Sequence, residues 1–518
     1  MEKEYSVIAI SRNFLPQLEQ ELTATTGSGL IPNRTVEIAN NRPGSKIQTH
    51  FMLTDEEAEQ LRLDPRVRAV EEPPENRSDI TLEKRASQTG VFYRGNNGLS
   101  ENVNWGLRRC ISESNTYSNS TLTTGDYLYS LTGKGVDIVV QDSGVDSDHP
   151  EWQDAEGNSR FQSINWYTES GLSGTQDSFF YLDYDGHGTH CAGIAAGKTY
   201  GWAKDSHIYS QKLAGLEGIS DPGVGVNIGE SFDLIRLWHN NKTNGRPTVV
   251  NMSWGYSTTI TSDPISGVYR GEPWTFNGET DTQLWDSYGI VSKFSGGANP
   301  DFRSLPAQVA FVDAEIDDMI DDGIHVCIAA GNDYYKADIP DGADYNNSVN
   351  FSGTNRFYHR PGSPYSSRAF FVGNIDSATI LDSIYKERTA GSSKKGPAVN
   401  IWAPGTDIQS TCSINYNTSS FSPVSYPADS NYNIMSISGT SMASPQIAGV
   451  CALYLESVPN LTPEELQNKV FTDTKSVIYT TANNDSDYRA FTSSLMGSDN
   501  RLLFTRYGVL NPYTITGN

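Results

Sequence analysis

Short runs rich in apolar residues recur along most of the chain, and they constrain the fold more than any other feature. They read GVDIVVQD, SHIYSQKL, TVVNMSW, IHVCIAA, AFFVGNI and AVNIWAP. Such runs are typical of strands that are buried on both faces of a parallel sheet. Helix-compatible stretches such as GESFDLIRLWHN and AQVAFVDAEIDDMIDDG lie between several of them. This alternation predicts an α/β fold with a mostly parallel central sheet.

The first 73 residues follow another pattern. Strand-like YSVIAIS, helix-like FLPQLEQELTAT, strand-like TVEIAN and SKIQTHFMLT, helix-like TDEEAEQLRLD and strand-like VRAVEE follow one another. Thr54 and Glu57 have the spacing of a capping box at the start of the second helix. The order β-α-β-β-α-β predicts a small α+β domain with a ferredoxin-like arrangement over residues 1–73.

The rest of the chain divides into a linker and one large domain. Residues 74–101 lose apolar periodicity, and we interpret them as an exposed linker that is open to proteolysis. Residues 102–518 carry the α/β pattern, interrupted by polar, glycine-rich segments. The largest of these covers about 256–305. Loops of that length in a compact domain usually carry function or disorder.

Charge and hydropathy exclude several classes of partner. The 518 residues carry a net charge of -24, which disfavours binding to nucleic acid or anionic membranes. No apolar run is long enough to cross a bilayer, and MEKEYSVIAISRN lacks the apolar core of a signal peptide. We therefore expect an intracellular or virion-associated protein rather than a classically secreted one. The five cysteines form no C-x-x-C pair, so neither a zinc site nor a disulfide framework is implied.

Polar residues stand where the apolar runs end. Asp142 follows VDIVVQ, and Asn332 follows IHVCIAAG. Open α/β sheets bind ligands beyond the carboxyl ends of their strands. Ser441 begins a long apolar helical pattern, between the small residues Gly439 and Ala443, which allow a substrate backbone to approach the hydroxyl. These positions are candidates for a catalytic site.

The segment DYDGHGTHCAGIAAG contains His187 and His190, and three interpretations are open. A helical zinc pair normally reads H-E-x-x-H, but here the two histidines are three apart and the glutamate is absent. Packing alone would also account for two histidines at a helix start rich in small residues. The third interpretation makes His187 a base, because Asp142, His187 and Ser441 follow one another in the chain order of the subtilisin triad.

Three segments carry a family resemblance. VVQDSGVDSDHPEW, DGHGTHCAGIAAG and SGTSMASPQIAGVCALYL resemble the catalytic segments of the subtilisin-like serine proteases (subtilases), and the resemblance extends over about residues 100–475. HGTHCAG is most similar to the proteinase K branch, and residues 1–73 are similar to the family's inhibitory propeptide. The resemblance implies a three-layer fold and a serine endopeptidase made as a self-processing zymogen. Its mature N-terminus would lie between about Glu75 and Asn102.

The resemblance also implies residue roles. Ser441 would be the nucleophile, His187 its base and Asp142 the group that orients the imidazole. The side chain of Asn332, with the backbone N–H of Ser441, would form the oxyanion hole. His190 has a structural role in this interpretation, and Cys191 is a buried free thiol. No cofactor is required for this chemistry.

Weaker predictions concern substrate and metal binding. Ser253, Trp254 and Gly255 resemble the strand that pairs with an extended substrate, although Trp254 fits a core position equally well. Asp333 either favours basic residues at the specificity pocket or is a solvated loop acid. The aspartate-rich loops DSGVDSDH and DIPDGADYNN are candidates for structural calcium, without a regular ligand spacing.

The expected partners are therefore a polypeptide substrate and the chain's own propeptide, which would act as an intramolecular inhibitor. Two alternatives stay open at this point. One is a structural or binding protein on the same scaffold, such as a virion or assembly component. The other is an esterase that uses the same triad.

Overall fold

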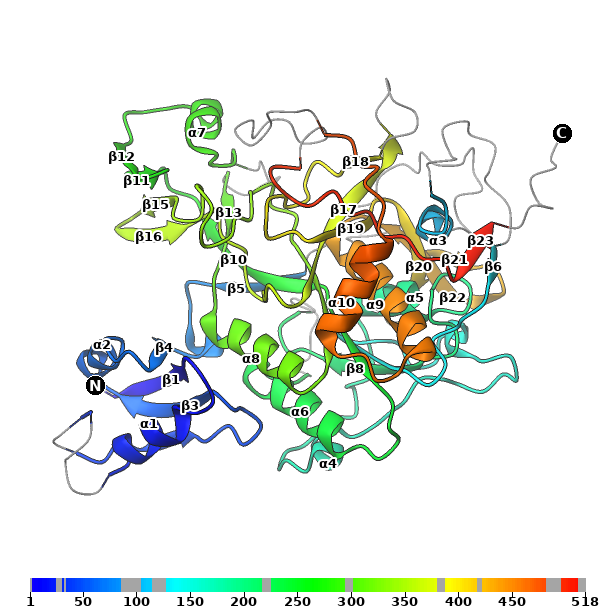
Figure 1. Ribbon diagram of the computed structural model, residues 1–518, viewed down its shortest axis with the longest axis horizontal. Helices are drawn as coiled ribbons and strands as arrows, with labels where there is room; N and C mark the ends of the chain where they lie inside the picture. Colours follow the sequence, from blue (N-terminus) through cyan, green and yellow to red (C-terminus); the bar gives the residue numbers. More distant parts are fainter. Residues whose placement is uncertain are drawn as a thin grey trace.

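The computed structural model has two units, a small N-terminal one and a larger one that holds the rest of the chain (Figure 1). The residues that the structure describes are 2–24, 30–31, 34–84, 104–113, 127–216, 225–293, 301–379, 387–416, 422–480 and 495–510.

A seven-stranded sheet forms the centre of the larger unit. Its order is β18-β17-β14-β9-β7-β8, and β19 also pairs with β17. All of these pairs are parallel except β17 with β18. The strands are β7 (Asp137–Asp142), β8 (His207–Lys212), β9 (Thr248–Met252), β14 (His325–Ala329), β17 (Phe370–Thr379), β18 (Glu387–Thr389) and β19 (Ile401–Pro404). Every residue of β7, β9 and β14 is buried, which explains the apolar runs and confirms the predicted mostly parallel sheet.

Helices form the two outer layers. On one side, α5 (His187–Ala196) packs against α9 (Thr440–Ser457), which also contacts β9, β14 and β17. On the other side, α6 (Ile228–Asn241) contacts α8 (Ala310–Asp321), which packs on β14. A Cβ atom at Gly188 would lie 2.0 Å from the carbonyl oxygen of Gly144. The first turn of α5 can therefore approach the end of β7 this closely only with glycine at position 188.

Smaller elements surround these layers. Further helices are α3 (Trp105–Arg109), α4 (Trp166–Ser170) and α10 (Pro463–Asp473), with 3₁₀ turns at Pro74–Asn76 and Pro150–Trp152. A three-stranded sheet contains β20 (Ile408–Cys412), β22 (Asp429–Ile437) and β21 (Val424–Tyr426), and β6 (Tyr127–Tyr129) pairs with β23 (Gly508–Leu510). None of the five cysteines forms a disulfide. No helix within the described ranges has both the length and the apolar character needed to cross a membrane.

The N-terminal unit has the predicted β-α-β-β-α-β order. Its elements are β1 (Lys3–Ala9), α1 (Leu15–Leu22), β2 (Ile38–Asn40), β3 (Gln48–Leu53), α2 (Asp55–Leu61) and β4 (Val67–Glu71). The antiparallel sheet has the order β2-β3-β1-β4, which is the ferredoxin-like arrangement. The predicted capping box is present, since the Thr54 hydroxyl accepts from the Glu57 N–H and the Glu57 carboxylate accepts from the Thr54 N–H. Residues such as Val7, Leu18 and Phe51 give this unit a core of its own.

The predicted loop at 256–305 is instead largely ordered secondary structure. It contains most of β10 (Trp254–Ile260), followed by β11 (Ser266–Tyr269), β12 (Glu272–Thr275), α7 (Asp281–Tyr288) and the start of β13 (Arg303–Pro306). β11 pairs with β15 (Ser348–Phe351), which also pairs with β16 (Thr354–Phe357). The sheet therefore draws on two polar stretches that are far apart in the sequence. Each stretch contributes only a few buried apolar residues to the shared cluster, such as Leu284, Val349 and Phe351.

The predicted linker at 74–101 also differs from the structure over its first part. A 3₁₀ turn at Pro74–Asn76 is followed by β5 (Thr81–Lys84), which pairs antiparallel with β10. Strand pairing uses backbone groups, so it needs no apolar side chains and left no pattern in the sequence. Residues 85–101 lie outside the described residues.

Candidate active site

Asp142 and His187 meet at the carboxyl edge of the central sheet. Asp142 is the last residue of β7, and His187 is the first residue of α5. The Nδ1 atom of His187 lies 2.7 Å from Oδ1 of Asp142, and both side chains are fully buried. The Nε2 atom of His187 is buried and has no hydrogen-bond partner among the residues that the structure describes. The carboxylate therefore sets the orientation of the imidazole and leaves its second nitrogen available.

Ser441 lies in the first turn of α9, close to this pair. Its Oγ atom donates a 2.9 Å hydrogen bond to the carbonyl oxygen of Ser253. Cys191, one turn beyond His187 on α5, has its sulfur 3.4 Å from the Ser441 carbonyl oxygen. A ligand atom of each of Asp142, His187 and Cys191 lies within 4.8 Å of the others. The structure thus brings the three segments together, with the Ser441 hydroxyl directed to Ser253 rather than to His187.

Such an arrangement is compatible with catalysis. Hydrogen bonds between catalytic groups are often long or misaligned before substrate binds. Rotation about the Cα–Cβ bond of Ser441 is the movement that would redirect its hydroxyl.

Asn332 follows β14 and contacts the start of α9. Its Oδ1 atom accepts from the Thr440 N–H at 3.0 Å and from the Thr440 hydroxyl at 3.3 Å. The Thr440 hydroxyl in turn accepts from the Gly331 N–H at 3.0 Å. Because Oδ1 faces Thr440, the NH₂ group of Asn332 lies on the other branch of the amide. The first N–H groups of α9 have no partner within the helix, so this region suits a developing negative charge.

Asp183 is a further residue of this site, and sequence reasoning assigned it no role. Its buried carboxylate accepts from the Gly186 N–H at 2.8 Å, the Ser143 hydroxyl at 2.9 Å, and the Thr189 N–H and hydroxyl at 2.9 and 2.6 Å. The Ser143 hydroxyl itself accepts from the Gly188 N–H at 2.9 Å. Asp183 therefore ties the residue after Asp142 to the first turn of α5. Its position four residues before His187 was the available signal.

His190 and Cys191, which follow His187 on α5, are both chemically inert. His190 Nε2 lies 3.0 Å from the carbonyl oxygens of both Ile408 and Met435, and burial lowers the pKa of His190 to about 3. A neutral His190 thus holds α5 against β20 and β22. Burial also raises the pKa of Cys191, which keeps the thiol protonated and unreactive.

Ser253 lies beside Ser441, and Trp254 is a core residue. The Ser253 hydroxyl donates to the Ser441 carbonyl oxygen at 3.0 Å. Trp254 is fully buried and its Nε1 donates to Gln141 at 3.2 Å, so it does not form the wall of an open subsite. Gly255 pairs with Glu83 of β5.

Asp333 fits neither of its predicted roles. Its carboxylate forms a 2.8 Å ion pair with Lys394, whose side chain is 1% exposed against 10% for Asp333. The negative charge is therefore already neutralised inside the protein. Asp333 is not a solvated acid, and it is not an unpaired charge for a basic substrate residue.

The second aspartate-rich loop also holds internal partners. Asp344 accepts from Arg270 at 2.7 Å and from Lys336 at 2.8 Å. Burial opposes the charge on Asp344, but the hydrogen bonds from Arg270 and Lys336 outweigh it and lower the pKa of this carboxyl. Structural calcium in these loops stays a prediction.

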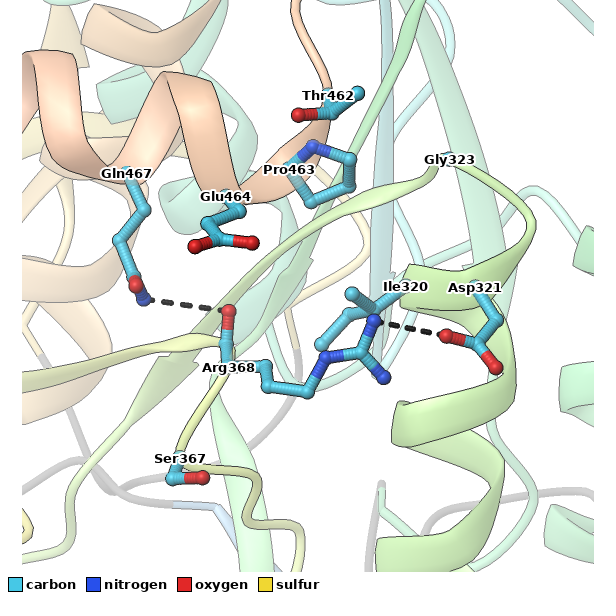
Figure 2. Close-up of a pocket in the computed structure, with 9 residues that line it drawn as sticks. All are labelled: Ile320, Asp321, Gly323, Ser367, Arg368, Thr462, Pro463, Glu464 and Gln467. Carbon is cyan, nitrogen blue, oxygen red and sulfur yellow. Dashed lines mark hydrogen bonds and ion pairs between the residues drawn. The ribbon is translucent and has the colours of Figure 1, made fainter. Parts of the chain in front are cut away.

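A cavity of about 640 Å³ lies away from the triad, between the end of α8 and the start of α10 (Figure 2). Arg368 donates to Asp321 at 2.8 Å inside it, and Gln467 donates to the carbonyl oxygen of Arg368 at 3.2 Å. None of the candidate triad residues lines this cavity. It therefore forms no part of the candidate active site.

Comparison with known proteins shows the family. A model of the subtilase family matches residues 133–501. The chain therefore belongs to the subtilase family.

Two curated relatives and one solved structure illustrate the similarity. Subtilisin-like proteinase Spm1 of Pyricularia oryzae is 28% identical over 435 residues, which are 81% of this chain and 59% of the relative. Subtilisin-like serine protease Cur l 4.0101 of Cochliobolus lunatus is 27% identical over 404 residues, 76% of this chain and 59% of the relative. The chain thus spans about three fifths of the length of these relatives.

Fervidolysin from Fervidobacterium pennivorans, described as a keratinolytic enzyme related to subtilisin, shares the fold. It is 16% identical, with 97% of this chain and 60% of that chain covered at a TM-score of 0.50. The predicted subtilisin-like fold is confirmed. The compartment expected from the sequence stays a prediction.

Proposed function

We propose that this chain is a serine endopeptidase whose triad is Asp142, His187 and Ser441. The observation that carries the proposal is the buried 2.7 Å contact between His187 and Asp142, next to Ser441, in a member of the subtilase family. His187 Nε2 takes the proton from Ser441 Oγ as that oxygen forms a bond to the scissile carbonyl carbon. Asp142 keeps the ring in place and stabilises the imidazolium.

The remaining steps use the same groups. The NH₂ group of Asn332 and the backbone N–H of Ser441 donate to the oxyanion, where one such donor is typically worth about 10²–10³ in turnover. His187 then passes its proton to the leaving amine as the peptide C–N bond breaks. Water, deprotonated by His187, hydrolyses the acyl-enzyme and restores the Ser441 hydroxyl.

Pairing of β5 with β10 supports a polypeptide substrate bound by strand addition. The Tyr256 N–H donates to Ser363, and the Tyr256 carbonyl accepts from the Ala307 N–H. Because alternate residues of a strand face opposite neighbours, Gly255 and Ser257 direct their backbone groups to β5. The register pairs Ser257 with Thr81 and Trp254 with Lys84. A chain bound in this way runs toward Ser253, whose carbonyl oxygen holds the Ser441 hydroxyl.

The same pairing supports the zymogen proposal. The N-terminal unit leads directly into β5, so its own chain lies where an extended substrate would bind. We infer that the N-terminal unit inhibits the enzyme and that the enzyme cuts this connection. Since pairing with β10 continues to Lys84, the cut bond is expected on the C-terminal side of Lys84. This narrows the interval for the mature N-terminus, which the sequence placed between about Glu75 and Asn102.

A serine replacement tests the proposal. Ser441→Ala in the full chain should stay uncut, and proteolysis should fall by roughly 10⁶-fold. The wild-type chain should yield a new N-terminus after residue 84 in N-terminal sequencing, and a fluorophosphonate should label Ser441. Ser444→Ala, which removes the nearby hydroxyl that donates to Asn251, is the matched control and should mature normally. Maturation of the Ser441→Ala chain at the wild-type rate would refute the triad.

A proline replacement tests strand addition. In the uncut Ser441→Ala chain, Glu83→Pro removes a backbone N–H that faces Gly255, whereas Glu83→Ala keeps it. One lost hydrogen bond is worth about 1 kcal/mol, so amide exchange in β10 should rise several-fold only with proline. Equal exchange in the two variants would contradict backbone pairing. Turnover of a peptide compared with that of the matching ester separates an endopeptidase from an esterase, and failure of all these tests would favour a binding scaffold.

A further inference from the structure

The helical face that contacts the N-terminal unit is rich in buried carboxylates. Asp233 comes from α6, Glu315 and Asp318 from α8, and Asp322 from the residue after α8. We call this group of four the acidic face. From the larger unit, Arg236 contacts Glu315 at 3.3 Å, Asp318 at 3.2 Å and Asp322 at 2.8 Å. Asp233 is not among these contacts, and the face keeps an excess of negative charge.

Arg42 of the N-terminal unit enters this face. It lies on the turn between β2 and β3. Its Nε donates to Asp233 at 2.9 Å and its Nη2 donates to Glu315 at 2.6 Å. The guanidinium carbon lies 4.6 Å from the centre of the Phe311 ring on α8. Only 1% of the Arg42 side chain is exposed, so its charge is removed from water where the two units meet.

The turn is shaped for this approach. A Cβ atom at Gly44 would lie 2.4 Å from Oδ1 of Asp233, so a side chain at position 44 would push the turn away. The Lys46 N–H donates to Asp318 at 2.9 Å, and the Lys46 ammonium pairs with Asp322. Burial opposes the charge on Arg42, but Glu315 and Asp233 outweigh it and raise the pKa of the guanidinium, which therefore stays charged.

Other ion pairs between the two units are exposed. Arg12 pairs with Asp321, and Arg68 pairs with Asp317 at 3.3 Å. The two arginine side chains are 48% and 40% exposed. Asp321 also keeps Arg368 as a partner inside the larger unit (Figure 2). Exposed pairs of this kind contribute little, whereas removing one partner of a buried pair leaves an uncompensated charge.

We propose that the acidic face is a recognition site for one guanidinium group, and that Arg42 is the residue that decides whether the N-terminal unit stays docked. The partner that this face selects is a protein loop that presents an arginine to Asp233 and Glu315 together. A lysine cannot replace it, because an ammonium group lacks the planar fork that reaches two carboxylates. Strand pairing at β10 reads only backbone groups, whereas the acidic face reads a side chain that is fully buried in the contact. One consequence of this recognition, retention of the N-terminal unit as an inhibitor, rests on the proposed zymogen function. The recognition itself does not.

The test uses the full chain with Ser441→Ala, which keeps both units joined. Amide exchange of α6 and α8 reports undocking, and exchange of β1 and β3 reports whether the N-terminal unit is folded. Arg42→Met should raise exchange on α6 and α8 on the order of 10²-fold, because it removes the guanidinium partner of buried Asp233 and leaves Glu315 with Arg236 alone. Arg42→Lys should fall between this variant and the parent. Arg12→Met is the matched control and should change exchange less than about threefold.

A rescue variant keeps the test decisive. Replacing the three charges together, with Arg42→Met, Asp233→Leu and Glu315→Met, also removes the two carboxylates that Arg42 contacts and should restore most of the protection. Equal exchange in Arg42→Met and Arg12→Met would overturn the proposal. If Arg42→Met also unfolds the N-terminal unit, Asp233→Asn and Glu315→Gln on the larger unit decide, and no undocking with either would overturn it. The readout is independent of peptide hydrolysis, so a failed protease assay and a failed docking test are distinguishable.

Discussion

Two groups of buried carboxylates in this protein are held by different kinds of partner. Around the candidate active site, Asp142 and Asp183 accept hydrogen bonds from backbone N–H groups, hydroxyls and the His187 ring. On the acidic face, the carboxylates meet the guanidinium groups of Arg42 and Arg236. Both groups are removed from water, but only the second is paired with fixed positive charge.

Because their partners differ, the two sets of carboxylates suit different functions. A carboxylate held by neutral donors keeps its negative charge uncompensated, so it can stabilise an imidazolium that forms during a reaction. A buried carboxylate paired with an arginine from a separate unit holds that unit in place, because removing either partner while the contact stays buried leaves an uncompensated charge. The first arrangement suits catalysis, and the second suits control of docking. Four predictions test this contrast.

The largest of these four effects is expected at Asp142. Asp142→Asn keeps the size of the side chain but removes the charge beside His187, so kcat on a peptide should fall by about 10⁴-fold. Asp154→Asn, in an exposed turn where Asp154 accepts from backbone N–H groups, is the matched control. A loss of less than tenfold in kcat for Asp142→Asn would contradict a catalytic role for the uncompensated charge of Asp142.

A smaller loss is expected at Asp183, which acts through position rather than contact with substrate. Asp183→Asn replaces one acceptor oxygen by an NH₂ group among the donors of Ser143, Gly186 and Thr189. Because small misplacements of catalytic groups can lower rates by up to about 10²-fold, we expect kcat to fall by roughly ten- to a hundredfold with KM nearly unchanged. Thermal unfolding of the same variant separates misplacement from loss of the fold. A selective rise in KM would contradict a positioning role.

The docked unit should loosen in acid. Burial, and after it the positive charge of Arg42, lower the pKa of His50 below its usual value of about 6.5, while Glu4 and Glu315 act in the opposite direction. The Phe311 ring of α8 also covers His50, with ring centres 5.6 Å apart. At His50 the docked state therefore binds fewer protons than a released one. Its stability is complete above about pH 6.5 and is lost as the pH falls through the pKa of the docked state.

Amide exchange of α6 and α8 in the Ser441→Ala chain measures this loosening across pH. His50→Gln should flatten the dependence, since glutamine does not titrate. If the dependence of amide exchange on pH is unchanged in His50→Gln, it must arise from other groups, such as the acids of α8.

The smallest effect is expected from salt. Exposed pairs such as Arg12 with Asp321 contribute about 0–1 kcal/mol and are screened at high ionic strength. Raising the salt concentration should therefore erase the small effect of Arg12→Met on exchange. The effect of Arg42→Met should persist, because a buried pair is screened much less. Equal salt sensitivity of the two variants would remove the distinction between buried and exposed pairs.

Several features were predictable because they depend on neighbours in the sequence. Buried strands of a parallel sheet must be apolar at nearly every position, so β7, β9 and β14 were recognised from their runs. The capping box of Thr54 and Glu57 was recognised for the same reason. Asp142, His187 and Ser441 each sit in a distinctive local segment, and their chain order suggested a shared site.

Other features depend on groups that meet only after folding. Asp333 forms an ion pair with Lys394, and the polar stretch at 256–305 forms a sheet with β15 and β16. β5 finds β10 through backbone groups that every residue possesses. None of these partners is marked by composition or periodicity.

The sequence by itself determined the layers of the fold, the order of elements in the N-terminal unit and the residue types at the candidate triad, because periodicity and local motifs are written into adjacent residues. Only the tertiary structure decided which buried charges are cancelled and by what. Arg42 meets Asp233 and Glu315 across 191 and 273 residues of chain. The energy of such a contact depends on distance and on exclusion of water, and neither is defined until the two units are packed together.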